Sequence, residues 1–200
     1  MFRILVTLAF AACSVVALAF PASAASDKAI FAGGCFWCVE SDFDHVPGVT
    51  STISGYIGGT IQNPTYENHP GFREAVEITF DPSKTTYAKL LTAYWHSVDP
   101  TDDGGQFCDR GESYTTAIYA TDQAQLKEAQ ASKAKIQAAL GKPVATVVAS
   151  APKFWRAEEY HQDFYKKNPL RYRYYRTGCG RDRIVKSVWG AKADEGITPH

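Results

Sequence analysis

Apolar and polar positions along the chain predict a succession of strands and helices. Short apolar or alternating runs predict strands at residues 28–32, 49–57, 75–80, 114–119 and 142–148. Apolar residues at helical spacing predict helices at residues 36–46, 87–95, 121–140 and 157–167. Strands mixed with helices in this order are typical of an α+β fold, and we expect a two-layer sandwich.

Three segments have no such pattern. Residues 61–71 contain two prolines and are expected to be a loop. Residues 99–113 are rich in Asp and Gly, and a loop of that length is usually functional or mobile. From residue 168 onward the chain is basic and tyrosine-rich, and we expect it to be irregular.

The N-terminus has the pattern of an export signal. Arg3 supplies a positive charge, residues 4–20 are almost wholly apolar, and a small-x-small pattern follows. We therefore expect residues 1–24 to be a signal peptide and residues 25–200 to form one exported domain, periplasmic or secreted. No later segment approaches the roughly twenty apolar residues of a membrane span, so none is expected in the mature form.

Charge and cysteine usage narrow the class of protein. The chain has 21 Lys and Arg against 21 Asp and Glu with no basic stripe, which argues against a nucleic-acid partner. Four cysteines follow the predicted signal peptide: Cys35, Cys38, Cys108 and Cys179. An even number is typical of structural disulfides in exported proteins, yet a domain of this size does not need them. The sequence therefore leaves open whether these cysteines are structural or reactive.

The strongest chemical signal is the run Gly-Gly-Cys-Phe-Trp-Cys-Val at residues 33–39. It follows the first predicted strand and opens the first predicted helix. Backbone N–H groups and the helix dipole favour a thiolate there, so we expect Cys35 to have a lowered pKa and to be nucleophilic. Phe36 and Trp37 offer an apolar wall for a small substrate group. The alternative for a CxxC motif is a structural metal site or a buried disulfide with Cys38.

Four further side chains are candidates for a supporting role. Glu74 lies just before a predicted strand, where a carboxyl can reach a cleft, although a solvated surface glutamate is the simpler interpretation. Tyr66 follows a proline turn, and Tyr114 follows the loop that contains Asp109. Asp109 can orient a hydroxyl or simply close a turn. None of these assignments stands on its own.

Taken together, these segments resemble the A-type peptide methionine sulfoxide reductases. The resemblance runs from about residue 29 to at least residue 165, with the motifs in the family's order. A Gly-Cys-Phe-Trp run followed by these motifs is far more specific than a bare CxxC. The matching segments are Gly34-Cys35-Phe36-Trp37, Val46-Pro47-Gly48-Val49, Ser54-Gly55-Tyr56-Ile57-Gly58-Gly59, Asn63-Pro64-Thr65-Tyr66, Glu74-Ala75-Val76, Asp99-Pro100 and Tyr160-His161-Gln162.

The resemblance implies thiol-dependent reduction of methionine-S-sulfoxide to methionine. Cys35 matches the family's nucleophile, which attacks the sulfoxide sulfur and becomes a sulfenic acid. Glu74 matches the acid that protonates the leaving oxygen, a role that a raised pKa in a partly apolar site would suit. Tyr66 and Tyr114 match two hydroxyl donors to that oxygen, and Asp109 matches a supporting acidic position.

The resemblance also implies a methyl pocket and a second cysteine. Phe36 and Trp37 match the pocket for the terminal methyl group of the substrate. Cys179 is favoured as the resolving or recycling thiol, because many family members carry that cysteine in the C-terminal segment. Cys38, three residues after the nucleophile, is the alternative, and both can act in sequence. Cys108 is expected to be a buried, unreactive thiol.

The expected fold is α+β, a two-layer sandwich with a mixed sheet, a ferredoxin-like core and a long irregular C-terminal segment. We expect a monomer with no bound metal or cofactor, recycled by an external thioredoxin-like dithiol reductant. Its substrates would be oxidised proteins or peptides, and also free methionine sulfoxide. Two positions depart from the family: Cys38 stands where many members have Gly, and Phe72, where His is common, suggests a drier acid site.

Two other classes remain as alternatives. A thioredoxin-like disulfide oxidoreductase also has a CxxC motif between a strand and a helix, but the rest of the chain does not predict a thioredoxin-like arrangement. A zinc domain would use all four cysteines as thiolate ligands, but Cys108 and Cys179 do not form a second CxxC.

Overall fold

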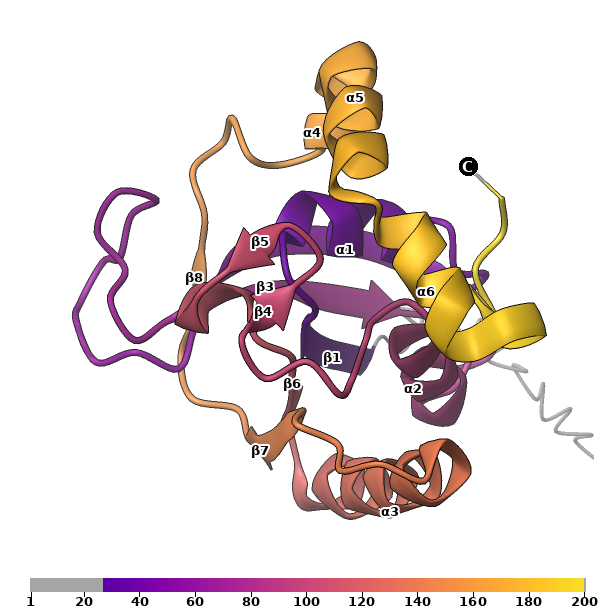
Figure 1. Cartoon of the computed structure of the whole chain (residues 1–200). Helices are drawn as coiled ribbons and strands as arrows, with labels where there is room; N and C mark the ends of the chain where they lie inside the picture. Colours follow the sequence, from indigo (N-terminus) through magenta and orange to yellow (C-terminus); the bar gives the residue numbers. More distant parts are fainter. Residues whose placement is uncertain (1–26, 200) are drawn as a thin grey trace, which may run out of the picture.

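The computed structural model describes residues 27–199 (Figure 1). The predicted signal peptide, residues 1–24, lies outside the described residues. The main elements are β1 Asp27–Ala32, α1 Phe36–Asp44, β2 Val49–Ile57, β3 Arg73–Phe80, α2 Tyr87–His96, β4 Gly105–Gln106, β5 Asp109–Arg110, the 3₁₀ turn η1 Glu112–Tyr114, β6 Ala117–Ala120, α3 Gln123–Leu140, β7 Val147–Ser150, β8 Phe154–Arg156, α4 Phe164–Lys167, α5 Pro169–Cys179, α6 Arg181–Trp189 and the 3₁₀ turn η2 Gly190–Lys192.

The main sheet has six strands in the order β7-β6-β1-β3-β2-β8. Strands β6 and β7 run parallel and all other neighbours run antiparallel, so the predicted mixed sheet is confirmed. A separate hairpin of β4 and β5 lies in front of this sheet in the view of Figure 1. The α+β class predicted from the sequence is therefore confirmed.

Strand β1 is central and buries side chains on both faces of the sheet. Phe31 lies on the face covered by α1 and α2, with its ring centroid 5.3 Å from that of Phe43 and 4.9 Å from that of Tyr94. Ile30 belongs to a separate apolar cluster, because successive residues of a strand point to opposite faces. The end of β1 is thus fixed from both sides, and the turn that follows it starts from a rigid strand.

Helices α2 and α3 begin at side-chain caps. Thr86 accepts a hydrogen bond from the Lys89 N–H, and Asp122 accepts one from the Gln125 N–H at 2.8 Å. Gly141, with φ of 62°, ends α3 in the left-handed conformation that favours glycine. None of the helices in the described part of the chain is long and apolar enough to cross a membrane.

The expectation of an irregular C-terminal segment is wrong, because this segment forms α5 and α6 (Figure 1). Pro169 opens α5, and Gly180, with φ of 69°, separates the two helices. The buried face of α5 holds Tyr172 and Arg176, and α6 begins with buried Arg181. Because arginines occupy buried positions, the apolar periodicity by which a helix is recognised is absent.

The predicted helix at 157–167 is also mostly wrong, since only α4 at its end is helical. Before α4, the Gln162 side chain accepts from the Ser54 N–H at 3.0 Å and donates to the Ser54 carbonyl at 2.9 Å. It therefore bonds to β2 as a neighbouring strand would. Strands predicted at 114–119 and 142–148 begin three and five residues later, at Ala117 and Val147.

Candidate active site

The turn between β1 and α1 presents Cys35 as the sequence predicts. Cys35 is the residue that precedes α1, and its carbonyl accepts from the Cys38 N–H at 3.1 Å and the Val39 N–H at 3.3 Å. Gly34 has φ of +87°, and a Cβ there would lie 2.7 Å from the Gln106 side chain. Glycine is therefore required immediately before the cysteine, both for the backbone conformation and for the close approach of a neighbouring loop.

Cys35 and Cys38 form a buried pair of thiols. Their side chains are 7% and 2% exposed, and the two sulfurs are hydrogen-bonded to each other. Burial raises the pKa of Cys35, and Cys38 and Glu74 add to this effect. The hydrogen bond from Cys35 lowers the pKa of Cys38, as do Arg181 and Arg176. The expected lowering of the Cys35 pKa by the helix N-terminus is therefore wrong, because burial outweighs the helix dipole.

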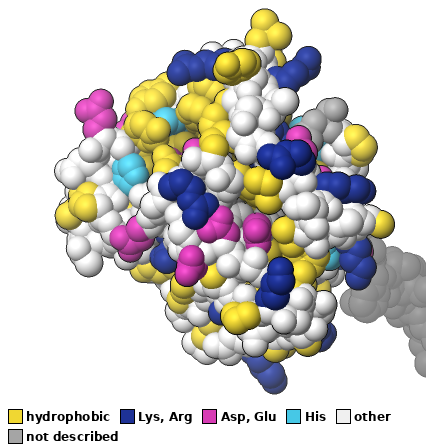
Figure 2. Space-filling view, in the orientation of Figure 1, with side chains coloured by type: hydrophobic (Ala, Val, Ile, Leu, Met, Phe, Trp, Pro, Cys, Tyr) yellow, Lys and Arg dark blue, Asp and Glu magenta, His cyan; other side chains and the backbone are white. Residues whose placement is uncertain are grey.

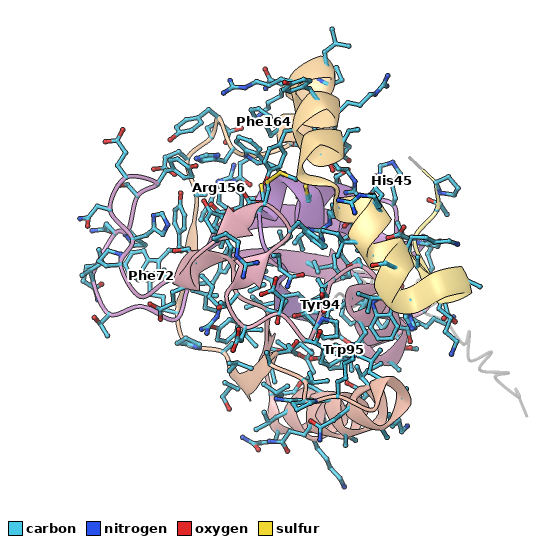
Figure 3. The ribbon with its side chains drawn as sticks, viewed as in Figure 1. His45, Phe72, Tyr94, Trp95, Arg156 and Phe164 are labelled. Atoms are coloured by element: carbon cyan, nitrogen blue, oxygen red, sulfur yellow. A yellow bond between two sulfur atoms is a disulfide. The ribbon has the colours of Figure 1, made fainter. Side chains whose placement is uncertain are left out.

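Glu74, at the start of β3, is a buried acid near Cys35. Its side chain is 2% exposed, and its Oε2 accepts a hydrogen bond from the Phe36 N–H at 2.9 Å. Burial raises the pKa of Glu74 to about 8, so this carboxyl carries a proton at neutral pH. The sequence expectation of a raised pKa is met. Phe72 is fully buried near the same strand (Figure 3), in agreement with a dry acid site.

Tyr66 and Tyr114 meet at the same site although 48 positions separate them in the sequence. Their hydroxyls are hydrogen-bonded to each other. Burial raises the pKa of both tyrosines, so both remain protonated donors at neutral pH. Glu158 holds the Tyr66 segment in place by accepting from the Tyr66 N–H at 2.9 Å.

Asp109, on β5, reaches the site through a tyrosine that the sequence analysis did not identify. The Tyr175 hydroxyl, on α5, donates to Asp109 Oδ2 and also interacts with the Cys35 sulfur. Burial raises the pKa of Asp109, whereas Tyr175 and Arg181 oppose this rise. Tyr175 was missed because its segment was expected to be irregular.

An aromatic cluster extends from the residues after Cys35 to the surface. Trp37 stacks on Phe164 with centroids 3.7 Å apart, and its Nε1 donates to His161 Nδ1 at 3.0 Å. The His161 ring also lies 4.8 Å from Phe36 and 4.8 Å from Tyr66. Figure 2 shows hydrophobic side chains gathered beside α5 on this face. The predicted pair Phe36 and Trp37 is thus part of a larger apolar wall, to which His161 and Phe164 are additions.

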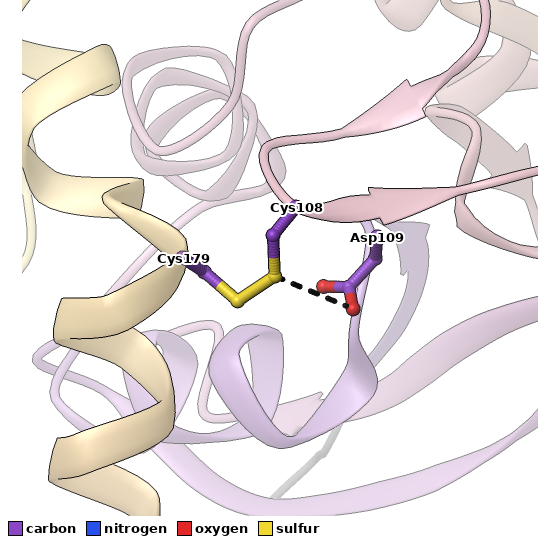
Figure 4. A group of neighbouring side chains, drawn as sticks. All are labelled: Cys108, Asp109 and Cys179. Atoms are coloured by element: carbon purple, nitrogen blue, oxygen red, sulfur yellow. Dashed lines mark hydrogen bonds between the residues drawn. A yellow bond between two sulfur atoms is a disulfide. The ribbon is translucent and has the colours of Figure 1, made fainter.

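The other two cysteines of the described residues form a second pair. Cys108 and Cys179 are joined by a disulfide, which ties the end of α5 to the β4–β5 hairpin (Figure 4). The Cys108 sulfur lies 3.8 Å from Asp109 Oδ1. Cys108 is exposed and bonded, so the expectation of a buried, unreactive thiol is wrong. The four sulfurs are divided into two pairs, and Cys179 is not a free thiol in this state.

A buried thiol pair beside a protonated acid and two hydroxyl donors is the site of a thiol-dependent oxidoreductase. Comparison with known proteins makes this class specific. Residues 27–193 match the model of the family described as peptide methionine sulfoxide reductase. The chain belongs to this family and is therefore an enzyme, as the sequence resemblance implies.

Individual relatives agree with this assignment. "Peptide methionine sulfoxide reductase MsrA 2" of Rhizobium meliloti is 56% identical over 184 residues, covering 90% of this chain and 93% of the relative. Mxr1 of Saccharomyces cerevisiae in reduced form is 28% identical with a TM-score of 0.67, covering 72% of this chain and 86% of Mxr1. The chain of Mxr1 in complex with Trx2 has the same fold, at 23% identity, a TM-score of 0.50 and coverage of 70% and 84%.

Proposed function

We propose that this enzyme reduces methionine-S-sulfoxide to methionine, in proteins and also as the free amino acid. The main support is that buried, protonated Glu74 and the buried thiol Cys35 meet at the first residues of α1. A sulfoxide oxygen is a poor leaving group and needs a proton as its bond to sulfur breaks. An acid whose pKa lies near 8 supplies that proton at neutral pH.

In the proposed reaction the Cys35 sulfur attacks the sulfoxide sulfur. Glu74 protonates the sulfoxide oxygen, while Tyr66 and Tyr114 donate hydrogen bonds to it as negative charge develops. The protonated oxygen leaves the substrate sulfur and is transferred to Cys35, whose thiol proton passes to the Glu74 carboxylate. The products are a sulfenic acid on Cys35 and methionine. The Tyr175 hydroxyl donates to Asp109 and also interacts with the Cys35 sulfur. Through Tyr175, Asp109 helps to orient the Cys35 side chain.

The aromatic wall is proposed to hold the rest of the substrate side chain. Phe36 and Trp37 line the route to Cys35, and the Trp37 ring is fixed by its stacking on Phe164 and its hydrogen bond to His161. A methyl group is small and apolar, and such a rigid wall excludes water from the reacting sulfur. An apolar wall for a methyl group, beside a proton donor for oxygen, therefore supports the proposed substrate class.

We assign the resolving role to Cys38, although the sequence resemblance favours Cys179. The Cys38 sulfur is hydrogen-bonded to that of Cys35, whereas Cys179 is already joined to Cys108. Attack by Cys38 on the sulfenic acid forms the S–S bond, breaks the S–O bond and releases water. An external dithiol must then reduce the Cys35–Cys38 disulfide.

The cellular setting is proposed from the sequence and the relatives. A thioredoxin-like protein is the proposed reductant, since Mxr1 has been crystallised with Trx2. The N-terminal pattern supports export, and with it the repair of oxidised exported proteins. The enzyme is proposed to act as a monomer. The order β6-β1-β3-β2 with α1 and α2 supports a ferredoxin-like core.

A thiol map after one turnover tests the proposal. The full chain is mixed with a methionine-S-sulfoxide peptide without reductant, and methionine and disulfides are measured by mass spectrometry. We expect one methionine per chain and a Cys35–Cys38 disulfide, with the Cys108–Cys179 disulfide unchanged. A Cys35–Cys179 disulfide would overturn the resolving role of Cys38. Absence of methionine, with unchanged thiols, would overturn the function itself.

The matched variants separate the two steps. Cys35→Ser should form no methionine at all. Cys38→Ser should form one methionine per chain and accumulate a sulfenic acid that a dimedone-type reagent traps. If Cys38→Ser formed an intramolecular disulfide as fast as the unchanged chain, another cysteine would be the resolving thiol.

A further inference from the structure

The two C-terminal helices place a pair of buried arginines against α1. Arg176 and Arg181 are 8% and 2% exposed. Their guanidinium groups contact one carboxylate, with Arg176 Nη1 2.6 Å from Asp42 Oδ1 and Arg181 Nη2 3.2 Å from Asp42 Oδ2. Burying two cations against one anion is costly unless another negative group lies nearby.

Two other acids near this cluster are more exposed than Asp42. Asp182 pairs with Arg176 at 2.8 Å, but its side chain is 60% exposed and solvent screens its charge. Asp194 interacts with both arginines, and burial raises its pKa. On the buried side that faces α1, the two guanidinium groups therefore lie against the carboxylate of Asp42.

Cys38 lies on the face of α1 that carries Asp42, the partner of both arginines. It precedes Asp42 by one helical turn, so both side chains lie on the same face of α1. Cys38 is 2% exposed and packs in a cluster with Tyr172 of α5, and the Tyr172 hydroxyl accepts from Arg176 Nη1 at 3.0 Å. A sulfur with a negative charge at this point would complete the charge balance of the buried cluster.

Hydrogen bonds hold Arg181 in a fixed position. Its Nη1 donates to the Gly33 carbonyl at 3.1 Å, and its Nη2 donates to the Ser97 carbonyl at 3.0 Å. The first of these bonds connects α6 to the turn that carries Cys35. The positive charge thus lies at the base of the CxxC motif and cannot move away without breaking buried hydrogen bonds.

We propose that Arg176 and Arg181 are positioning residues that keep Cys38 as a thiolate, ready to attack the sulfenic acid on Cys35. This inference rests on the proposed function, in which Cys38 resolves the sulfenic acid. The Cys38 sulfur forms the new S–S bond, the S–O bond of Cys35 breaks, and the departing hydroxide takes a proton to become water. Arg176 and Arg181 contact neither sulfoxide nor sulfenic acid and act only through Cys38.

Several groups affect the pKa of Cys38, and together they lower it. The hydrogen bond from Cys35 has the largest effect in lowering the pKa of Cys38, followed by Arg181 and Arg176, whereas burial and Asp42 oppose it. Glu74 is protonated at neutral pH and adds no charge. The tyrosines on α5 that interact with this thiolate, both protonated, are Tyr172 and Tyr175.

A pH titration of the Cys38 thiolate tests the inference without any sulfoxide. The full chain carrying Cys35→Ser, which keeps a hydroxyl donor beside Cys38, is titrated by ultraviolet thiolate absorbance. Subtracting the titration of the Cys35→Ser/Cys38→Ser chain removes the absorbance of Cys13 and of the tyrosines. We expect a midpoint clearly below the ordinary thiol value of about 8.5. A midpoint at or above that value would overturn the inference, and this measurement needs no arginine variant.

Arginine variants identify the source of the shift. Adding Arg181→Met should raise the midpoint by about one pH unit or more, and Arg181→Lys should keep most of the lowering because it keeps the charge. Arg183→Met, on the same helix but exposed, is the control and should leave the midpoint unchanged. A folded Arg181→Met chain with the original midpoint would overturn the role of Arg181.

The same variants are then compared in the chain with both cysteines. After one turnover at pH 7, Arg181→Met should slow formation of the Cys35–Cys38 disulfide by up to about tenfold, in proportion to the lost thiolate. Methionine formation by the unchanged chain is measured in parallel, and its absence would overturn the proposed function and not the titration result. Disulfide formation at the original rate in Arg181→Met would overturn the inference alone.

Discussion

Replacement of Glu74 by Gln should slow catalysis and stabilise the fold. Burial raises the pKa of Glu74 from its ordinary value of 4.5 to about 8. The folded chain then holds a proton that the unfolded chain releases, so stability is greatest below pH 4.5 and falls as the pH rises toward 8. Each pH unit corresponds to about 1.4 kcal/mol, which makes the cost about 3 kcal/mol at pH 7 and about 5 kcal/mol above pH 8. Gln is neutral at every pH and removes this cost.

The assay combines urea unfolding at pH 5 and pH 8 with single-turnover methionine formation. The stabilisation of Glu74→Gln should be several kcal/mol larger at pH 8, and methionine formation should be about 10²-fold slower or more because the proton donor is lost. In the unchanged chain, methionine formation should decline above pH 8 as Glu74 ionises. A Glu74→Gln chain with an unchanged single-turnover rate would refute the acid role, and an equal stability difference at both pH values would refute the raised pKa.

The chain contains a matched control for this experiment. Glu40, on α1, is 1% exposed, and burial raises its pKa to about 8, with Asp163 and Asp44 adding to the effect. Its Oε2 accepts from the Asp163 N–H at 3.0 Å, whereas Glu74 Oε2 accepts from the Phe36 N–H. Glu40→Gln should therefore give a similar pH-dependent gain in stability with no loss of methionine formation. Loss of the reaction in both variants would mean that the rate effect is not specific to the proton donor.

Two further predictions concern the oxygen donors and the second cysteine pair. Tyr66→Phe and Tyr114→Phe should each slow single-turnover methionine formation by about 10²-fold, because each removes a donor to the developing charge. The exposed Tyr174→Phe should not slow it. Equal rates in all three variants would contradict the roles of Tyr66 and Tyr114. Cys108→Ser should lower the free energy of unfolding in urea by about 4 kcal/mol, because the Cys108–Cys179 disulfide links positions 71 residues apart; a loss below about 1 kcal/mol would show that this link does not constrain the unfolded chain.

The position of Cys35 at the turn between β1 and α1 could be predicted because its signal is local. A strand, two glycines and a helix follow one another within residues 27–44, and the φ of Gly34 explains why glycine stands there. Glu74 was found only through the family resemblance, since nothing in its neighbourhood tells a buried carboxyl from a solvated one. Its burial results from the pairing of β3 with β1 and β2, which depends on distant parts of the chain.

The C-terminal part could not be predicted from patterns because its helices bury charge. Arg176 and Arg181 occupy positions that an apolar stripe would normally fill, and their partner Asp42 is more than 130 positions away. The pairing of Cys179 with Cys108 was missed for a similar reason: it depends on where α5 ends relative to the β4–β5 hairpin. Tyr175 was missed for the same reason, because it lies on α5.

The two sides of the cysteine helix differ in a way that the proposed reaction requires. The first step needs a proton for the sulfoxide oxygen, and burial of Glu74 on the β3 side keeps that proton in place at neutral pH. The second step needs a sulfur without its proton, and the arginines of α5 and α6 favour that form of Cys38. A CxxC motif in uniform surroundings would favour the same protonation state for both cysteines. The C-terminal helices therefore do more than cover the site: in the proposed mechanism their positive charge adds to the hydrogen bond from Cys35 in lowering the pKa of Cys38.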